Sequence, residues 1–374
     1  MSSLRYALVN VVGTLARFFP WPCKTGLVEI GRPGRESPVL VTCNYRLTVE
    51  RLRRALRGVD AYLLVANSRG INVWCAATGG LLTNHDVLSI LKTSGIEDRV
   101  DHRQVMLPQL AATGVEGRAL EEKSGWKVVW GPVYADDVPA FLGTQLEKST
   151  EMRQVRFPWT QRLEMAVAWA LPVSLLSVLI TAVIWRQALL PAAFVVWGLA
   201  LALYMCFPLY GRWLGSESTS RWVLLGVLVG LWGVALLLLA GYTYAVTGES
   251  VGEIGRWAVL TFVVLLVMGI DLLGSTPLSK SGFQEDGRLK LVLDKERCRG
   301  VGYCEEVCPR GCYEVDRAQR SASMPGAQRC VQCGACIVQC PNDALHFESP
   351  EGGIIAPDTI RRFKLNLMGK RVER

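Results

Sequence analysis

Cysteines are the residues of this sequence best suited to chemistry: it has 12, and those from Cys298 to Cys340 are closely spaced. The second half of this group reads Cys330-Val-Gln-Cys333-Gly-Ala-Cys336-Ile-Val-Gln-Cys340-Pro341. The spacing C-x2-C-x2-C-x3-C-P folds a loop around one cubane iron–sulfur cluster and gives its fourth cysteine to a second cluster. A zinc site is the alternative, but the proline and the three tightly spaced thiols disfavour it.

The first half of the group repeats this frame with one change. It reads Cys298-Arg-Gly-Val301-Gly-Tyr-Cys304-Glu-Glu-Val-Cys308-Pro309, so Val301 stands in the place of the second cysteine. Because the two motifs exchange their fourth ligands, one site receives four thiolates and the other only three. Together the motifs resemble bacterial two-cluster ferredoxins over about residues 288–350, which implies an α+β fold and electron transfer.

We therefore predict two unequal clusters in a domain spanning residues 285–350. Cluster II is predicted as a [4Fe–4S] cluster bound by Cys308, Cys330, Cys333 and Cys336. Cluster I is predicted as a [3Fe–4S] or a labile [4Fe–4S] cluster bound by Cys298, Cys304 and Cys340. Cys312 is either a substitute fourth ligand of cluster I or a small buried hydrophobic residue.

The N-terminal region is expected to hold an amphipathic helix and no signal peptide. It has one early basic residue and a broken apolar run, unlike a signal peptide, so we expect a reducing compartment rather than a secreted disulfide scaffold. Within residues 1–24, one helical face collects Leu4, Leu8, Val11, Val12, Leu15, Phe18 and Phe19. Such a helix either packs on a domain or lies on the bilayer.

Residues 25–150 alternate short apolar runs with amphipathic stretches, a pattern typical of an α/β domain with a mostly parallel sheet. Strands are predicted at Leu27–Ile30, Val39–Cys43, Ala61–Ala66 and Lys127–Trp130, and helices at Val49–Leu56, His85–Leu91 and Ala135–Leu142. Sheets of this kind bind ligands at the carboxyl ends of their strands. The glycine-flanked segment Asn67–Gly80 follows a predicted strand, so we expect it at that edge of the sheet.

A cysteine opens a predicted helix inside this segment. The run is Asn72-Val73-Trp74-Cys75-Ala76-Ala77. A cysteine in such apolar company is usually a core residue. A helix N-terminus, however, lowers a thiol pKa and favours the thiolate, which is the form that binds metals.

The run from Asn72 to Ala77 resembles the cap-helix motif of the corrinoid protein of the mercury-methylating pair. The stretches Leu107–Val115, Val129–Leu142 and Gly274–Gly282 resemble the same family. There a Rossmann-like corrinoid domain precedes a membrane domain, and a separate two-cluster ferredoxin is the partner. The resemblance covers most of residues 25–350 and implies a fusion of the two proteins. The α/β domain is more distantly similar to that of the corrinoid iron–sulfur protein of the acetyl-CoA pathway.

The resemblance implies corrinoid-dependent methyl transfer supported by an in-cis iron–sulfur reductase domain. Cys75 would be the lower axial cobalt ligand, and the cap helix beneath the corrin would be formed by Asn72, Val73, Trp74, Ala76 and Ala77. The partners would be a methyl donor, either a protein or a methylated pterin, and a low-potential electron donor. Two departures from the family, Thr78-Gly79-Gly80 in place of Gly-Lys and a missing terminal cysteine pair, predict weak or no mercury methylation. The alternative is a membrane-bound iron–sulfur electron carrier without methyltransferase activity.

The composition places a membrane domain between the two soluble parts. Half of the residues are hydrophobic and 20% are charged, and charge is nearly absent from Met165 to Gly274. Four apolar blocks predict an all-α transmembrane domain over residues 160–275, with spans at Met165–Trp185, Gln187–Tyr210, Trp222–Val246 and Trp257–Gly274. The multidomain chain is therefore expected in the cell membrane as a multi-pass protein.

The basic residues predict the orientation of the spans. They precede the first span, occupy the second loop and follow the fourth span, so both soluble domains should face the cytoplasm. The net charge of +8 reflects these residues and a basic tail over residues 351–374, expected in solvent or on lipid headgroups. No zinc finger or RNP-like motif is present, so we expect no nucleic-acid partner.

Overall fold

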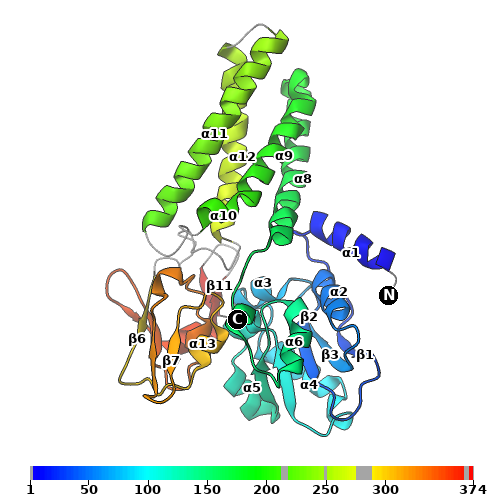
Figure 1. Cartoon of the computed structure of the whole chain (residues 1–374), viewed down its shortest axis with the longest axis vertical. Coiled ribbons are helices and arrows are strands. Elements are labelled where there is room, and N and C mark those ends of the chain that lie inside the picture. The colour runs from blue at the N-terminus through cyan, green and yellow to red at the C-terminus, as the bar shows by residue number, and fades with distance from the viewer. Residues whose placement is uncertain (1–2, 212–217, 248–250, 275–288, 366–369, 374) are drawn as a thin grey trace. The chain divides into compact units, whose positions relative to one another are not determined.

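The computed structural model describes residues 3–211, 218–247, 251–274, 289–365 and 370–373, which fall into two compact units. One unit comprises residues 1–13, 19–156 and 281–374, and the other comprises residues 14–18 and 157–280. The first unit therefore contains the α/β domain and the cysteine-rich domain together (Figure 1). The predicted family segment at residues 274–282 lies, beyond Gly274, outside the described residues.

A five-stranded sheet forms the centre of the α/β domain. Its strands are β1 (Gly26–Ile30), β2 (Val39–Cys43), β3 (Ala61–Ala66), β4 (Gln104–Leu107) and β5 (Lys127–Trp130), in the order β1-β3-β2-β4-β5. The pairs β2–β3, β2–β4 and β4–β5 are parallel, and β1 is antiparallel to β3 at one edge. The prediction of a mostly parallel sheet is confirmed, although β4 was not predicted, because four residues after a polar stretch give little periodicity.

Helices cover both faces of this sheet, as in most α/β domains. The helical elements are α2 (Arg46–Ala55), α3 (Val73–Thr78), α4 (Asn84–Thr93), η1 (Ile96–Asp98), η2 (Gln109–Thr113), α5 (Gly117–Ser124), η3 (Ala135–Asp137), α6 (Val138–Gly143) and α7 (Thr150–Arg153). Residues alternate along β2: Val39 and Val41 join a core with α3, α4 and α5, whereas Leu40 joins a core with α2 and α6. This alternation places the carboxyl ends of the strands between two helical layers.

The cysteine-rich domain is built from short elements joined by loops. They are β6 (Lys290–Leu293), α13 (Tyr303–Val307), β7 (Glu314–Asp316), β8 (Ser321–Ser323), η7 (Ala327–Arg329), α14 (Ala335–Gln339), β9 (Leu345–Glu348), β10 (Ile354–Ile355), α15 (Pro357–Arg362), β11 (Phe363–Leu365) and β12 (Arg371–Glu373). The strands pair as β10-β9-β6, β7-β8 and β11-β12. Cys304 lies on α13 and Cys336 on α14, and the other cysteines of the domain lie in the connecting loops.

The predicted basic tail is wrong as a description of residues 351–374. Arg361 forms ion pairs with Asp343 (2.6 Å), Asp358 (2.9 Å) and Glu116 (3.5 Å). The side chain of Lys364 is buried, and its Nζ donates to the carbonyl of Thr113 at 2.9 Å. Acidic groups and carbonyls that are distant in sequence bind these cations, and composition alone could not reveal such partners.

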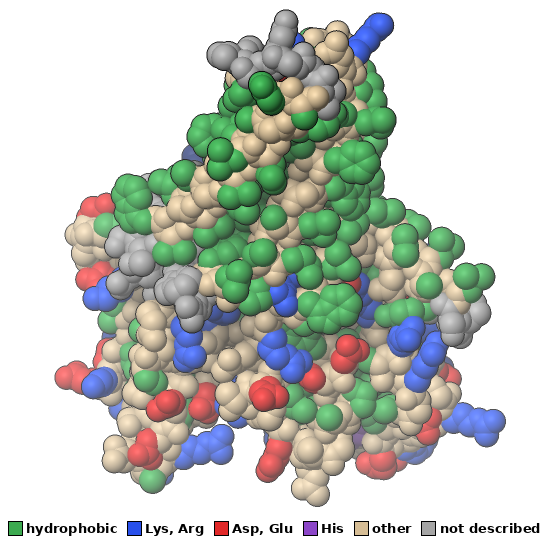
Figure 2. Space-filling model, turned by 45° about the horizontal axis from the view of Figure 1, so that its top comes forward, with side chains coloured by type: hydrophobic (Ala, Val, Ile, Leu, Met, Phe, Trp, Pro, Cys, Tyr) green, Lys and Arg blue, Asp and Glu red, His purple; other side chains and the backbone are tan. Residues whose placement is uncertain are grey.

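The second unit is helical. It contains α8 (Trp159–Ile184), η4 (Arg186–Ala188), α9 (Leu189–Met205), α10 (Phe207–Tyr210), α11 (Ser218–Thr247) and α12 (Val251–Gly274). Within the part of the chain that the structure describes, four helices are long and apolar enough to cross a membrane, as predicted. Figure 2 shows hydrophobic side chains over the visible faces of these long helices. Helix α12 is longer than the predicted fourth span, because it extends toward its N-terminus through Glu253 and Arg256.

Helix α1 (Ser3–Leu15) has one packed face and one exposed apolar face. Tyr6 lies under the guanidinium of Arg54, and the side-chain oxygen of Asn10 accepts from Arg51 at 3.0 Å, so the packed face contacts α2. The predicted apolar residues lie on the other face and are exposed, from 37% for Leu15 to 81% for Leu4. The predicted packing of this helix on a domain is therefore seen for its more polar face and not for its predicted apolar face.

Candidate functional site

Helix α3 lies just beyond the carboxyl end of β3 and presents Cys75 outward. Asn72 caps the helix: its side-chain oxygen accepts from the backbone NH of Cys75 at 2.9 Å, and its Nδ2 lies 3.5 Å from the Cys75 sulfur. The buried residues of the helix are Val73, Ala76 and Ala77, whereas Cys75 is exposed. Cys75 therefore contributes little to the core and is accessible to a ligand from outside the domain.

The loop before α3 is held by a buried asparagine that the sequence analysis missed. Asn44 directly follows β2, and its side-chain oxygen accepts from the backbone NH groups of Ser68 and Gly70, each at 2.9 Å. Gly70 has φ +74°, and a Cβ atom there would lie 2.6 Å from the nitrogen of Pro22. A polar residue immediately after a buried strand was the available signal, since it marks the ligand-binding edge of the sheet.

The segment after β4 supports α3 from its inner side. This bridging segment, residues 109–117, runs from η2 into the start of α5. A Cβ atom at Gly114 would lie 2.5 Å from the carbonyl oxygens of both Ala77 and Leu82, so the backbones approach too closely for any side chain. The position of α3 consequently depends on the position of the bridging segment.

The cysteine-rich domain docks on the same segment by polar contacts. The Nζ of Lys148 donates to Gln109 Oε1 (3.0 Å) and to the carbonyls of Gly131 (3.2 Å) and Glu306 (3.1 Å). Burial lowers the pKa of Lys148 to about 7, an effect opposed by the Glu306 carboxylate. The Val155 NH also donates to the Pro309 carbonyl at 2.9 Å. These contacts make the two domains one compact unit.

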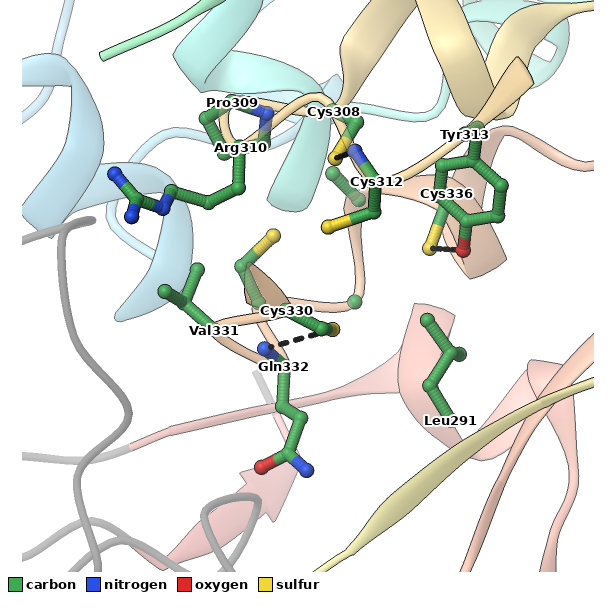
Figure 3. Close-up of a pocket in the computed structure, with 13 residues that line it drawn as sticks. Leu291, Cys308, Pro309, Arg310, Cys312, Tyr313, Cys330, Val331, Gln332 and Cys336 are labelled. Carbon is green, nitrogen blue, oxygen red and sulfur yellow. Dashed lines mark hydrogen bonds between the residues drawn. The ribbon is translucent and has the colours of Figure 1, made fainter. Parts of the chain in front are cut away.

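The four cysteines assigned to cluster II line one cavity. Its lining includes Cys308, Cys330, Cys333 and Cys336, with Cys312 beside them. Figure 3 shows the sulfur atoms of Cys308, Cys312, Cys330 and Cys336 around a common space. The lining also includes the apolar residues Leu291 and Val331 and the polar residues Arg310 and Gln332.

The three cysteines assigned to cluster I line a second cavity together with Val301. Cys298, Cys304 and Cys340 contribute to this lining. The two motifs exchange their fourth cysteines as predicted from the spacing. Cys340 of the second motif lines the cluster I cavity, and Cys308 of the first motif lines the cluster II cavity. Burial raises the pKa of Cys304 to about 12, so this thiol needs a nearby cation to ionise.

The two cysteine loops have matching backbones. Val301 lies between Gly300 (φ +63°) and Gly302 (φ +96°), and Cys333 lies between Gln332 (φ +53°) and Gly334 (φ +77°). Each loop then enters a five-residue helix that is followed by a cysteine and a proline. The two cysteines have nearly the same backbone conformation, with φ −72° and ψ 115° at Cys308 and φ −74° and ψ 113° at Cys340. Val301 thus occupies the position that Cys333 occupies in the other loop.

Of the two alternatives for Cys312, a substitute ligand of cluster I does not fit its position. Cys312 lies in the cavity of cluster II, within hydrogen-bonding reach of Cys308 and Cys330. Its buried side chain agrees with the other reading, a small buried residue. The reason is local: the turn after Pro309 folds Cys312 back over Cys308, whose sulfur accepts from the Cys312 NH at 3.4 Å.

Hydrogen bonds to sulfur distinguish the two cavities. In the cluster II cavity, the Tyr313 hydroxyl donates to Cys336 (3.1 Å) and the Gln332 NH donates to Cys330 (3.4 Å) (Figure 3). In the cluster I cavity, the Ala344 NH donates to Cys340 at 3.3 Å. Such bonds are among the features that set cluster potentials. Tyr313 was missed by the sequence analysis, although it directly follows Cys312.

The donor sets fit iron–sulfur clusters better than single metal ions. Among the described residues, no three or more Cys, His, Asp or Glu side chains lie close enough together to hold one ion. A structural zinc ion binds its thiolates directly in a closed tetrahedron, whereas a cluster separates its ligands by its own width. Thiols spaced around a cavity therefore match a cluster.

Comparison with known proteins divides the chain in the same way. Residues 17–142 match the family model described as the CO dehydrogenase/acetyl-CoA synthase delta subunit. Residues 267–357 match the model described as electron transfer flavoprotein-ubiquinone oxidoreductase, 4Fe-4S. The first match agrees with the similarity to the acetyl-CoA pathway protein seen in the sequence.

Similar curated proteins are archaeal. The acetyl-CoA decarbonylase/synthase complex subunit gamma of Archaeoglobus fulgidus is 34% identical over 125 residues, 33% of this chain and 26% of that protein. The corresponding subunit of Methanopyrus kandleri is 36% identical over 125 residues, 33% of this chain and 27% of that protein. The chain spans about a quarter of the length of these relatives. It thus joins a domain similar to these gamma subunits, four apolar helices and a 4Fe-4S domain.

Proposed function

We propose that this protein is a membrane-anchored, corrinoid-dependent methyltransferase whose cysteine-rich domain is an in-cis reductase with a two-cluster ferredoxin fold. The observation that supports the proposal most is the exposed Cys75 on α3, at the carboxyl edge of the sheet, within the domain that resembles gamma subunits. The same compact unit contains both cysteine-lined cavities. Mercury is not proposed as the substrate.

The chain's own residues have defined roles in this proposal. Cys75 would hold the cobalt of the corrinoid through its thiolate, and the amide of Asn72, 3.5 Å from its sulfur, would donate to that thiolate. The cap helix would rest under the corrin through Val73, Trp74, Ala76 and Ala77. When bound, the corrinoid would carry the methyl group and the clusters would supply the electrons that keep it reactive.

The composition of the purified protein tests this function. Anaerobically purified full-length chain should contain about one cobalt and about seven or eight iron atoms, and should show corrinoid bands that shift on reduction and methylation. Iron without cobalt, even after incubation with cobalamin, would favour the alternative, a membrane-bound iron–sulfur electron carrier.

Both soluble domains are proposed to face the cytoplasm. The apolar helices are even in number, and positive residues flank them as the positive-inside rule requires. Reporter fusions after Arg156 and after Arg374 should therefore both read cytoplasmic, and a fusion after Trp185 should read external. Opposite readings at Arg156 and Arg374 would contradict the proposal, because they require an odd number of spans.

The lipid bilayer is also the proposed partner of α1. The exposed face of this helix includes Leu4 and Leu8, which are 81% and 62% exposed, and Phe19, four residues beyond the end of the helix, is 71% exposed. Residues just after the helix contact the first span: Arg17 pairs with Glu164 at 3.1 Å, and the ring of Phe18 lies 4.6 Å from that of Trp169. A helix with an exposed apolar face is suited to the lipid interface.

A further inference from the structure

Gln339 is a buried side chain that joins the two soluble domains. It is the last residue of α14, lies between Cys336 and Cys340 in sequence, and is 7% exposed. Its Oε1 accepts from the NH of Gly117 at 3.0 Å. Its Nε2 donates to the carbonyls of Ala112 (2.8 Å) and Val115 (2.7 Å). The amide is therefore satisfied by the bridging segment of the other domain.

The groups that bind Gln339 surround the contact with α3. Ala112 and Val115 flank Gly114, the glycine packed against the carbonyls of Ala77 and Leu82. The bridging segment has α14 on one side and α3 on the other. A displacement of α14 from this segment would leave buried backbone groups unpaired and would alter the support of Cys75.

Cluster II lies on the side of the domain that packs against this core. Cys333 and Ala335 pack with the hydrophobic core that also contains Val73 and Ala76 of α3. The other packed ligands, which are Cys308, Cys330 and Cys336 of cluster II and Cys304 and Cys340 of cluster I, belong to the separate core of the cysteine-rich domain. Among the described ligands, Cys333 of cluster II is therefore the one that packs against the core containing α3. The first loop is more open to solvent, with Val301 51% exposed.

We infer that Gln339 is a positioning residue that fixes cluster II against the bridging segment, which makes cluster II the immediate electron donor to the corrinoid. The inference rests on the proposed function. One electron would pass from cluster II to the bound corrinoid, whose cobalt would be the acceptor. A low-potential one-electron donor refills the clusters. Because tunnelling rates fall steeply with distance, a small shift of α14 would slow this transfer.

The test uses Gln339→Met in the whole chain, with Gln319→Met as a control. Methionine keeps the length of glutamine but cannot bond to Ala112, Val115 or Gly117. Gln319 belongs to the same domain, but it is exposed in the turn between β7 and β8 and lines neither cysteine cavity. Gln339→Glu is a second variant, because it keeps the acceptor for Gly117 and loses both donors.

Two readouts separate positioning from folding. In corrinoid-free protein, hydrogen–deuterium exchange at residues 73–82 and 109–117 should increase about tenfold or more in both Gln339 variants, since buried backbone groups lose their partners. In corrinoid-loaded protein, paramagnetic resonance should show cobalt(II) broadening the cluster II signal in the wild type and in Gln319→Met. That broadening should weaken in the Gln339 variants, and electron transfer from pre-reduced cluster II to cobalt should slow about tenfold or more.

Each contrary result has a defined meaning. Unchanged exchange together with unchanged broadening in the Gln339 variants would overturn the inference. Faster exchange with unchanged broadening and transfer rates would reduce Gln339 to a structural residue and also overturn it. Stronger broadening of the cluster I signal than of the cluster II signal would reverse the proposed order of the clusters. Failure of the wild type to bind corrinoid would instead overturn the proposed function, and this inference with it.

Discussion

Replacing Cys75 with alanine should abolish cobalt–thiolate ligation and leave the fold intact. The sulfur is exposed, and the buried contacts of α3 come from Val73, Ala76 and Ala77. The helix cap also survives, because Asn72 accepts from the backbone NH of residue 75 and not from its side chain. Visible spectra of corrinoid-loaded protein should show the bands of the thiolate complex in the wild type alone.

The expected effect of Cys75→Ala on methyl transfer is more than about 100-fold. Removing only an outer partner of a metal ligand commonly costs about 10- to 100-fold in affinity or activity, so removal of the ligand itself should cost more. Expression, membrane insertion and iron content should stay at wild-type levels. Cys206→Ala is the matched control, since Cys206 is also exposed but lies at the end of α9. A Cys75→Ala spectrum identical to the wild type would refute axial ligation.

Local sequence patterns were enough to predict the elements that position Cys75. The runs Val39–Cys43 and Ala61–Ala66 are buried along their whole length, so their hydrophobicity predicted both strands with correct bounds. Because Asn67–Gly80 directly follows the run Ala61–Ala66, it was predicted at the carboxyl edge of the sheet, where α3 lies in the structure. Strand β4 was missed because only Val105, Met106 and Leu107 are buried, and three residues cannot distinguish a strand from a loop.

The contacts between the domains could not be predicted from local patterns. Gln339 forms hydrogen bonds with residues more than 220 positions earlier, and the residues next to it in the sequence do not indicate those partners. The same is true of Arg361, which looked like part of a solvated basic tail until its pairing with Glu116 placed it against α5. Spacing predicted which cysteines could share a cavity, whereas the side chains that fix the cavities relative to α3 required the three-dimensional structure.

Replacing Val301 with cysteine should convert cluster I from a three-iron to a four-iron cluster. Val301 lies in the cavity with Cys298, Cys304 and Cys340, and its loop has the backbone of the loop that presents Cys333. A thiol at this position would therefore point where the equivalent thiol points in the other cavity. Valine cannot bind iron, and a residue 51% exposed leaves that corner open to water. A corner ligated only by water or hydroxide loses its iron easily.

Electron paramagnetic resonance of oxidised protein measures this conversion. The wild type should show a three-iron signal that nearly disappears in Val301→Cys, with a gain of about one iron per chain. Val301→Ser is the matched control, because a hydroxyl of similar size is a much weaker iron ligand and should leave the three-iron signal in place. Cys312→Ala should also leave it in place, because Cys312 lies in the cavity of cluster II. Two equivalent four-iron clusters in the wild type would show that another ligand completes cluster I, and the role assigned to Val301 would then be wrong.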